Sequence, residues 1–276
     1  MQKAADSIRE KGGTIVLVPT MGFLHEGHLS LIREGKKHGD HIILSIFVNP
    51  TQFEPGEDFE TYPQDFESDS TAAAKEGVDI VFAPDIADLY GDNFETYISL
   101  ENLPRHLCGL SRPTHFRGVA TIVAKLFHIT KPHVAVFGSK DYQQLAIIRR
   151  MTADLNMDIE IVGAPIVREP DGLAMSSRNA YLTTEQRQSA PVLYSSLLAA
   201  RQMVQEGETD AAAIIQKTVE RIAAVPDAAI DYIAICDPDT LDEVEIICGP
   251  VLMALAVHLG ACCRLIDNMI LTPDPS

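Results

Sequence analysis

Two histidines three positions apart, His25 and His28, stand in the segment PTMGFLHEGH at residues 19–28. An apolar, β-branched run at 14–18 predicts a strand before this segment, and helical spacing of apolar residues over 29–38 predicts a helix after it. A glycine-containing turn at a helix start brings backbone N–H groups and the helix dipole to a phosphate. Imidazoles on one face of the opening turn can donate to phosphate oxygens and stabilise charge developing there. The segment therefore predicts a phosphate-binding turn.

Other interpretations of the histidine pair stay open at this level. His25 and His28 are equally compatible with partly buried structural histidines, and a zinc site would need at least one further protein ligand, for which no partner is obvious. The HxGH spacing directly after the first predicted strand resembles the nucleotidyltransferase superfamily that includes the class I aminoacyl-tRNA synthetases. The chain contains no P-loop, no GxGxxG after a strand and no GxSxG, so the usual competing nucleotide and nucleophile motifs are missing.

Three further polar segments combine donors and cations. FVNPTQF at 47–53 contains Gln52, whose amide both donates and accepts and so suits a ligand with hydroxyls and a carboxylate. FGSKDYQQ at 137–144 places Lys140 near a glycine where a helix is predicted to begin, and MSSRN at 175–179 offers two hydroxyls and an arginine that can hold pyrophosphate. Each segment alone is also typical of an ordinary turn, a solvated charge or a loop.

The elements that position these segments alternate along the first 164 residues. Strands are predicted at 14–18, 41–48, 78–83, 133–137 and 158–162, and helices at 29–38, 65–76, 119–129 and 142–155. Such alternation indicates an α/β fold with a Rossmann-like, doubly wound parallel sheet. Ligands bind beyond the carboxyl ends of strands in these sheets, where the polar segments fall.

The pattern changes near Pro165, so we predict two domains, 1–164 and 165–276. Helices are predicted at 185–205 and 210–224, the first opened by a capping box of Thr183 and Gln186. Extended runs at 229–235, 251–259 and 261–265 follow, the last two meeting in a hairpin at Gly260. The second domain is predicted to be small and α+β.

Composition narrows the class of protein. The 276 residues carry a formal net charge of −17, which makes nucleic acid a poor partner because phosphate backbones are held by Lys and Arg. No apolar run reaches the length of a membrane span, and the polar start of the chain predicts no export signal. The five cysteines lack metal-ligand spacing, so we expect reduced thiols, no metal bound by them and a cytoplasmic protein.

Taken together, the polar segments resemble the pantothenate synthetase family over nearly the whole chain. The motifs PTMGxLHxGH, NPxQF, KDYQQ and DGLAxSSRN occur in that order, the last at 171–179. The resemblance implies an ATP-dependent ligase that joins pantoate to β-alanine through a pantoyl-adenylate and releases AMP and pyrophosphate. It also implies Mg²⁺ bridging the phosphates and a homodimer.

The resemblance carries roles to individual residues. His28 is implied as proton donor, with His25, Lys140 and Arg178 as the other catalytic residues. Gln52 is implied to contact pantoate and β-alanine, and Gln144 to contact pantoate. The first domain would bind nucleotide and pantoate, and the second would close over it as a lid. The implied ATP-binding residues are Met21, Gly22, Phe23, Leu24, His25, Glu26, Gly27, His28, Gly138, Ser139, Lys140, Asp141, Val167, Met175, Ser176, Ser177 and Arg178.

The chain departs from the family pattern at three places. Ser139 stands where the family commonly has glutamate, and Thr114 where it often has glycine. Family members also usually carry a short extra strand before the segment matching 4–11, so either the start codon is misplaced or an edge strand is absent. The late start is expected to bear on stability more than on activity, and the Ser139 side chain is not expected to carry chemistry.

Two rival functions remain on sequence grounds. Another HxGH cytidylyl- or adenylyltransferase would retain the nucleotide in its product, and would not be expected to carry NPxQF and KDYQQ. A nucleotide-binding regulatory protein would have lost catalysis, whereas His25, His28, Lys140 and Arg178 are all present. Release of AMP and pyrophosphate separates the three.

Overall fold

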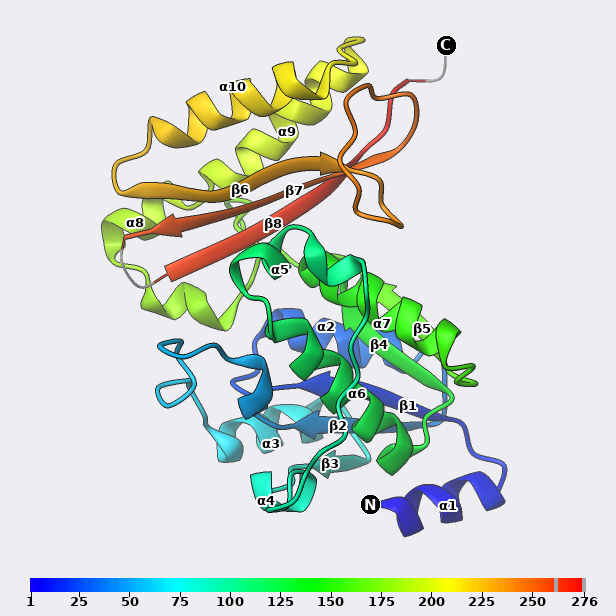
Figure 1. The fold of residues 1–276 in the computed structure, drawn as a ribbon. Helices are drawn as coiled ribbons and strands as arrows, with labels where there is room; N and C mark the ends of the chain where they lie inside the picture. Colours follow the sequence, from blue (N-terminus) through cyan, green and yellow to red (C-terminus); the bar gives the residue numbers. More distant parts are fainter. Residues whose placement is uncertain (261–262, 275–276) are drawn as a thin grey trace. The chain divides into compact units, whose positions relative to one another are not determined.

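The computed structural model describes residues 1–260 and 263–274, which form two compact units (Figure 1). The N-terminal unit comprises Met1–Glu101, Arg112–Ser139 and Gln144–Ile166. The C-terminal unit comprises the described part of Val167–Ser276 together with two short segments from earlier in the chain, Asn102–Ser111 and Lys140–Gln143. Nothing in the sequence pattern predicted that these two segments belong to the C-terminal unit.

A five-stranded parallel sheet forms the centre of the N-terminal unit, in the order β3-β2-β1-β4-β5. The predicted Rossmann-like sheet is confirmed. Because β1 is central and its run Ile15–Val18 is apolar throughout, the strand is buried on both faces. The strands are β1 (Ile15–Thr20), β2 (His41–Ile46), β3 (Ile80–Phe82), β4 (Val134–Gly138) and β5 (Glu160–Ala164).

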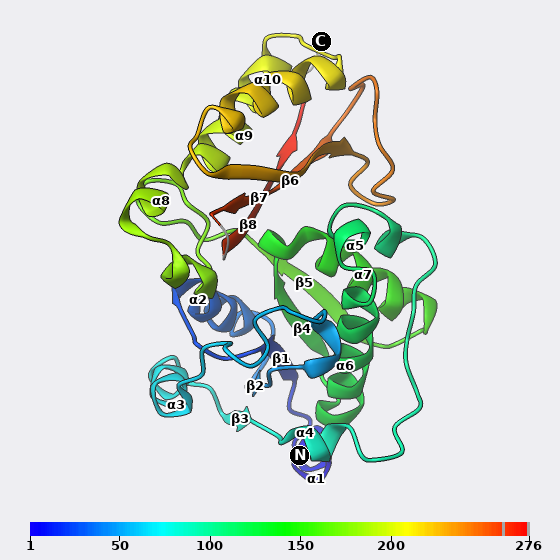
Figure 2. The same ribbon diagram turned by 60° about the vertical axis from the view of Figure 1, so that its left-hand side comes forward.

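Helices cover both faces of this sheet, with α2 on one side and α6 on the other (Figure 2). Leu31 and Ile32 of α2 pack in one core cluster with Ala73 of α3 and the strand residues beneath them. On the other face the ring of Phe127 in α6 lies 6.5 Å from that of Phe137 in β4. The helices are α1 (Gln2–Glu10), which the sequence did not predict, α2 (Glu26–Gly35), α3 (Phe66–Lys75), α4 (Ile86–Leu89), α6 (His115–Thr130) and α7 (Tyr142–Asp154).

The C-terminal unit is a three-stranded antiparallel sheet, β6-β7-β8, covered by α9 and α10 (Figure 1). Leu193 and Leu197 of α9 and Ile214 of α10 pack against Leu255 and Val257 of β7. The predicted small α+β domain is confirmed in architecture. Its elements are α5 (Cys108–Ser111), α8 (Thr184–Ser189), α9 (Val192–Gln205), α10 (Ala211–Ala223), β6 (Ala228–Cys236), β7 (Val251–Leu259) and β8 (Cys263–Leu271).

Hydrogen bonds explain why residues 102–111 group with this unit. The buried Gln143 donates from Nε2 to the carbonyls of Leu103 and His106, at 2.8 and 2.7 Å, and accepts from the N–H of Cys108 at 3.0 Å. Ser111 Oγ donates to Asp231 of β6 at 3.1 Å. Gln143 is therefore a structural glutamine.

The prediction of one helix over 185–205 is wrong, because the chain breaks into α8 and α9 around Pro191. Proline has no N–H for the i−4 carbonyl, which ends the hydrogen-bond ladder there. The capping box before α8 is confirmed: Gln186 N donates to Thr183 Oγ1 at 3.3 Å, and Thr183 N donates to Gln186 Oε1 at 3.0 Å.

The third C-terminal strand runs further than the predicted 261–265, to Leu271. Gly260 has φ +65°, but the rest of the predicted hairpin turn, and Cys262 with it, lies outside the described residues. Cys108, Cys236, Cys248 and Cys263 are free thiols. No helix in the described part of the chain is long and apolar enough to cross a bilayer.

The core of the C-terminal unit predicts a difference between two adjacent leucines of α9. Leu197 is fully buried, whereas Leu198 is only partly buried. Leu197→Ala is expected to lower the free energy of unfolding by about 2–5 kcal/mol through lost burial and the cavity left behind. Leu198→Ala, the same substitution in the same helix, is expected to cost clearly less. Urea unfolding of both variants measures this, and equal losses would contradict the assigned core.

Candidate active site

The two histidines of the HxGH segment cap the helix that follows β1. His25 is the N-cap of α2, and its Nδ1 accepts from Gly27 N at 3.1 Å. His28 Nδ1 accepts from His25 N at 3.3 Å, and the two ring centroids are 4.1 Å apart. Since each Nδ1 accepts, the proton of each neutral ring lies on Nε2. The pair therefore presents two Nε2–H donors from one helix start.

A buried carboxylate shapes the loop before these histidines. Asp69 of α3 is 3% exposed and accepts from Phe23 N at 2.8 Å and Leu24 N at 2.7 Å. Gly22 and Phe23 both have positive φ, +89° and +52°, and a Cβ on Gly22 would lie 2.9 Å from Asp69 Oδ2. Glycine is thus needed at 22 for the close approach of the carboxylate. Asp69 could not be predicted from the sequence pattern, because an acid in a helix more than 40 residues away gives no local signal.

The structure differs here from the expected backbone cradle for phosphate. Six N–H groups of the turn have acceptors within the protein: those of Gly22, Phe23, Leu24, His25, Gly27 and His28. Most backbone N–H groups of the turn are therefore engaged within the protein. The Glu26 side chain pairs with Arg33 on the surface of α2, so its carboxylate contributes to the stability of this helix.

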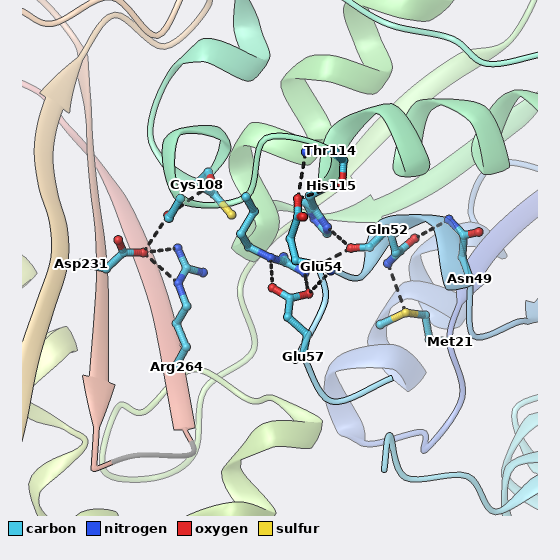
Figure 3. Close-up of polar contacts among 12 residues, drawn as sticks. Met21, Asn49, Gln52, Glu54, Glu57, Cys108, Thr114, His115, Asp231 and Arg264 are labelled. Carbon is cyan, nitrogen blue, oxygen red and sulfur yellow. Dashed lines mark hydrogen bonds and ion pairs between the residues drawn. The ribbon is translucent and has the colours of Figure 1, made fainter. Parts of the chain in front are cut away.

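Gln52 lies at the end of the short 3₁₀ helix η1 (Pro50–Gln52), which follows β2. The residue is 9% exposed. Its side chain accepts at Oε1 from Asn49 Nδ2 at 3.0 Å and donates from Nε2 toward Met21 Sδ at 3.2 Å (Figure 3). Its backbone carbonyl accepts from Arg112 at 3.2 Å and His115 at 2.7 Å. The structure thus brings the NPxQF glutamine into contact with the first residue of the HxGH turn.

Gly138 closes β4 at the same edge of the sheet. A Cβ on this residue would meet only Leu31 Cδ2, at 4.0 Å, among the described atoms within 4 Å. Its φ is not positive, so neither packing nor backbone conformation requires glycine here. A glycine with no internal reason marks a place where a ligand approaches the backbone closely. Ser139 follows at the start of η3 (Ser139–Asp141), and Gln144 is partly exposed on α7.

In the C-terminal unit, two adjacent residues of β8 hold the other predicted site segments. Asn268 Nδ2 donates to the Lys140 carbonyl at 2.8 Å. The buried Asp267 accepts from both terminal nitrogens of Arg168, at 2.6 and 2.9 Å. Arg168 belongs to the turn that carries Val167 and Met175, which are joined by a 2.9 Å backbone bond. Neither Asp267 nor Asn268 was predicted from the sequence.

Hydrogen bonds and ion pairs hold the DGLAxSSRN segment in place. Asn179 Nδ2 donates to Glu169 Oε1 at 3.0 Å and to the Ala174 carbonyl at 3.1 Å, closing the loop. Arg187 pairs with Asp171 and Glu169, each at 2.5 Å, and its guanidinium keeps the pKa of Asp171 below its ordinary value. Ser176 accepts from Arg178 N at 3.3 Å at the start of η4 (Ser177–Tyr181).

Comparison with known proteins agrees with these motifs. A sequence profile described as pantoate-beta-alanine ligase matches residues 1–270. The pantothenate synthetases of Desulfatibacillum aliphaticivorans and Geobacter sulfurreducens are 59% and 54% identical, covering 99% and 98% of this chain and 97% and 95% of their own lengths.

Solved structures agree as well. The pantothenate synthetase of Thermus thermophilus matches with TM-score 0.92 and 42% identity, over 98% of each chain. The pantoate-beta-alanine ligase of Francisella tularensis, complexed with beta-gamma ATP and beta-alanine, matches with TM-score 0.78 and 35% identity, over 99% of this chain and 97% of that one. The family resemblance of the motifs is thereby confirmed. The chain belongs to the pantoate–β-alanine ligase family.

Proposed function

We propose that the chain condenses pantoate with β-alanine at the expense of ATP, forming pantothenate, AMP and pyrophosphate through a pantoyl-adenylate. One observation carries the proposal in a chain of this family. The Nε2–H₂ group of Gln52, on the substrate side, lies 3.2 Å from Met21 Sδ, at the start of the nucleotide-side HxGH turn. The Francisella tularensis relative complexed with beta-gamma ATP and beta-alanine supports the same pair of ligands.

The chemistry requires activation, because a carboxylate and an amine do not condense in water without a leaving group better than oxide. A carboxylate oxygen of pantoate attacks the α-phosphorus of ATP, and the bond from that phosphorus to the pyrophosphate oxygen breaks. The neutral amine of β-alanine then attacks the acyl carbon, AMP leaves with the shared oxygen, and the amine loses a proton. Exclusion of water protects the mixed anhydride between the two steps.

We assign the residue roles by donor chemistry. His28 and His25 donate from Nε2 to phosphate oxygens as charge builds on the leaving pyrophosphate. Lys140 and Arg178 balance phosphate charge, and Gly138 admits the nucleotide close to the backbone. We assign the remaining predicted ATP-site residues either to stabilising the surrounding loops or to contacting ATP through their backbone atoms. Gln52 and Gln144 are assigned to pantoate, and Gln52 also to β-alanine.

The finer expectations stay predictions. Mg²⁺ is proposed to arrive with ATP on phosphate oxygens and water, its usual ligands with nucleotides. Among residues 1–260 and 263–274 no group of three or more His, Cys, Asp or Glu is placed to hold a metal ion. The homodimer, the cytoplasmic location and the lid role of the C-terminal domain are likewise proposed.

The route of oxygen tests the function directly. Pantoate labelled with ¹⁸O in its carboxylate is expected to transfer one labelled oxygen to the phosphate of AMP, because that oxygen bridges carbon and phosphorus in the adenylate. Mass spectrometry of AMP measures this. Label found only in pyrophosphate or orthophosphate would mean attack at another phosphorus. A nucleotide retained in the product would favour the rival nucleotidyltransferase, and no turnover would favour a regulatory protein.

The two nitrogens of His28 can be tested separately. His28→Asn keeps an acceptor near the position of Nδ1, which caps α2, but removes the Nε2–H donor. Pantoate-dependent ATP–pyrophosphate exchange is expected to fall about 100-fold or more, with the melting temperature nearly unchanged. His128→Asn, at an exposed position of α6, is the matched control. Exchange within a few-fold of wild type would return His28 to a purely structural role.

Asp69 is expected to act on ATP through the loop that it holds. Asp69→Asn replaces one of two acceptor oxygens with an N–H₂ group facing a backbone N–H, so the loop at 22–24 loses a hydrogen bond. The KM for ATP is expected to rise by about 10-fold, with a smaller change in the KM for pantoate. Glu67→Gln, at an exposed position of the same helix, controls for the lost charge. Equal effects on both substrates would argue against this role.

A further inference from the structure

The Asn49 side chain uses its whole hydrogen-bonding capacity inside the protein. The residue is 1% exposed. Its Nδ2 donates to Gln52 Oε1 at 3.0 Å and to the Gly118 carbonyl at 3.2 Å. Its Oδ1 accepts from the hydroxyls of Tyr90 at 2.8 Å and Thr51 at 3.0 Å. Two hydrogens and two lone pairs are therefore all engaged.

The Gly118 carbonyl decides which way the Asn49 amide points. A backbone carbonyl can only accept, so the group that faces it must be the N–H₂. The opposite orientation would set two carbonyl oxygens against each other at a buried position, with no donor between them. The carbonyl reaches this position because residue 118 has no side chain: a Cβ there would lie 2.3 Å from the Thr51 carbonyl oxygen.

The orientation of the Asn49 amide in turn fixes the orientation of the Gln52 amide. Because the Asn49 N–H₂ faces Gln52, the carbonyl oxygen of Gln52 must turn toward it and the Gln52 N–H₂ must turn away. That N–H₂ points toward Met21 Sδ (Figure 3), and a thioether is a weak acceptor. The buried Gln52 therefore keeps a strong donor group whose partner is only a weak acceptor. An oxygen atom of a ligand would be a better acceptor for this N–H₂ group.

We infer that Gln52 binds pantoate only as a hydrogen-bond donor, and that Asn49, Gly118 and Tyr90 are positioning residues that set this polarity. The inference rests on the proposed function and deepens it. The pantoate group bound at Gln52 is an acceptor oxygen, of the carboxylate or of a hydroxyl acting as acceptor. The site therefore selects against a ligand that offers a donor, such as an ammonium or amide N–H, at this position.

Tyr90 lies in a row of aromatic rings, and another tyrosine of the same row, Tyr97, provides a control substitution. Its ring is 4.9 Å from that of Phe94, which is 5.2 Å from that of Tyr97. Burial raises the pKa of Tyr90, so its hydroxyl remains a donor at neutral pH. The Tyr97 hydroxyl has no hydrogen-bond partner among the described residues, and its ring is held by Phe94 and by Arg117, 3.9 Å from the ring centroid. Tyr97→Phe thus removes a hydroxyl from the same row without touching Asn49.

The first test compares two substitutions of Gln52 in pantoate-dependent ATP–pyrophosphate exchange. Gln52→Ala removes the donor, whereas Gln52→Glu keeps an acceptor for Asn49 and turns a carboxylate oxygen toward the ligand. Gln52→Glu is expected to raise the KM for pantoate at least about 10-fold more than Gln52→Ala, with the KM for ATP within about 2-fold of wild type. A Glu variant that binds pantoate as well as the Ala variant, or better, overturns the inference.

The second test asks whether Asn49 acts through Gln52. Asn49→Asp replaces the N–H₂ with an oxygen, so the Gln52 amide is expected to reverse and the KM for pantoate to rise about 10-fold or more. In the Gln52→Ala background the same substitution is expected to add less than about 2-fold, since the group it orients is gone. An undiminished effect there would mean that Asn49 acts by another route.

Tyr90→Phe is the milder variant, kept because a buried aspartate at 49 can destabilise the protein. Tyr90→Phe is expected to raise the KM for pantoate by about 3-fold, and to leave that KM unchanged in the Gln52→Ala background. Tyr97→Phe is expected to change the KM for pantoate by no more than about 1.5-fold. Equal effects of the two tyrosine substitutions overturn the role of Tyr90. Wild-type protein without pantoate-dependent exchange would contradict the proposed function itself, whereas normal exchange with a different variant pattern contradicts this inference alone.

Discussion

The parallel pairing of β1 with β2 and β4 is the constraint on which the candidate site residues of the N-terminal unit depend. Parallel strands end at one edge of the sheet, so the HxGH turn after β1, the NPTQF segment after β2 and Gly138 at the end of β4 lie at that edge. The strand order 3-2-1-4-5 places β1 between the other two. These two strand pairings thus bring together residues separated by more than 100 positions in the chain.

Buried polar residues then position the side chains and loops that lie at this edge of the sheet. Asp69 engages two backbone N–H groups of the turn, and Asn49 engages four partners around Gln52. In the C-terminal unit Asp267 and Asn268 do the same for Arg168 and Lys140. A buried amide or carboxylate with every hydrogen bond satisfied adopts a single orientation, because each alternative leaves a buried group unpaired.

Much of this was accessible from sequence, and the failures have definite physical causes. Apolar runs gave the strands of the parallel sheet, and the capping box at Thr183 gave the start of α8. The predicted helix over 185–205 ignored the missing N–H of Pro191. The predicted backbone cradle treated the N–H groups of the turn as available, whereas a carboxylate from α3 occupies two of them.

By itself the sequence determined the kinds of chemistry, because motif spacing and strand periodicity are local properties: two imidazoles at a helix start, an amide after the second strand, and lysine and arginine in later turns. Only the tertiary structure decided how those groups are presented. Which nitrogen of each histidine carries the proton depends on backbone N–H donors of the folded helix start. Which end of the Gln52 amide faces the ligand depends on a distant backbone acceptor. The Gly118 carbonyl, 66 residues beyond Gln52, sets that polarity because a carbonyl can accept but never donate.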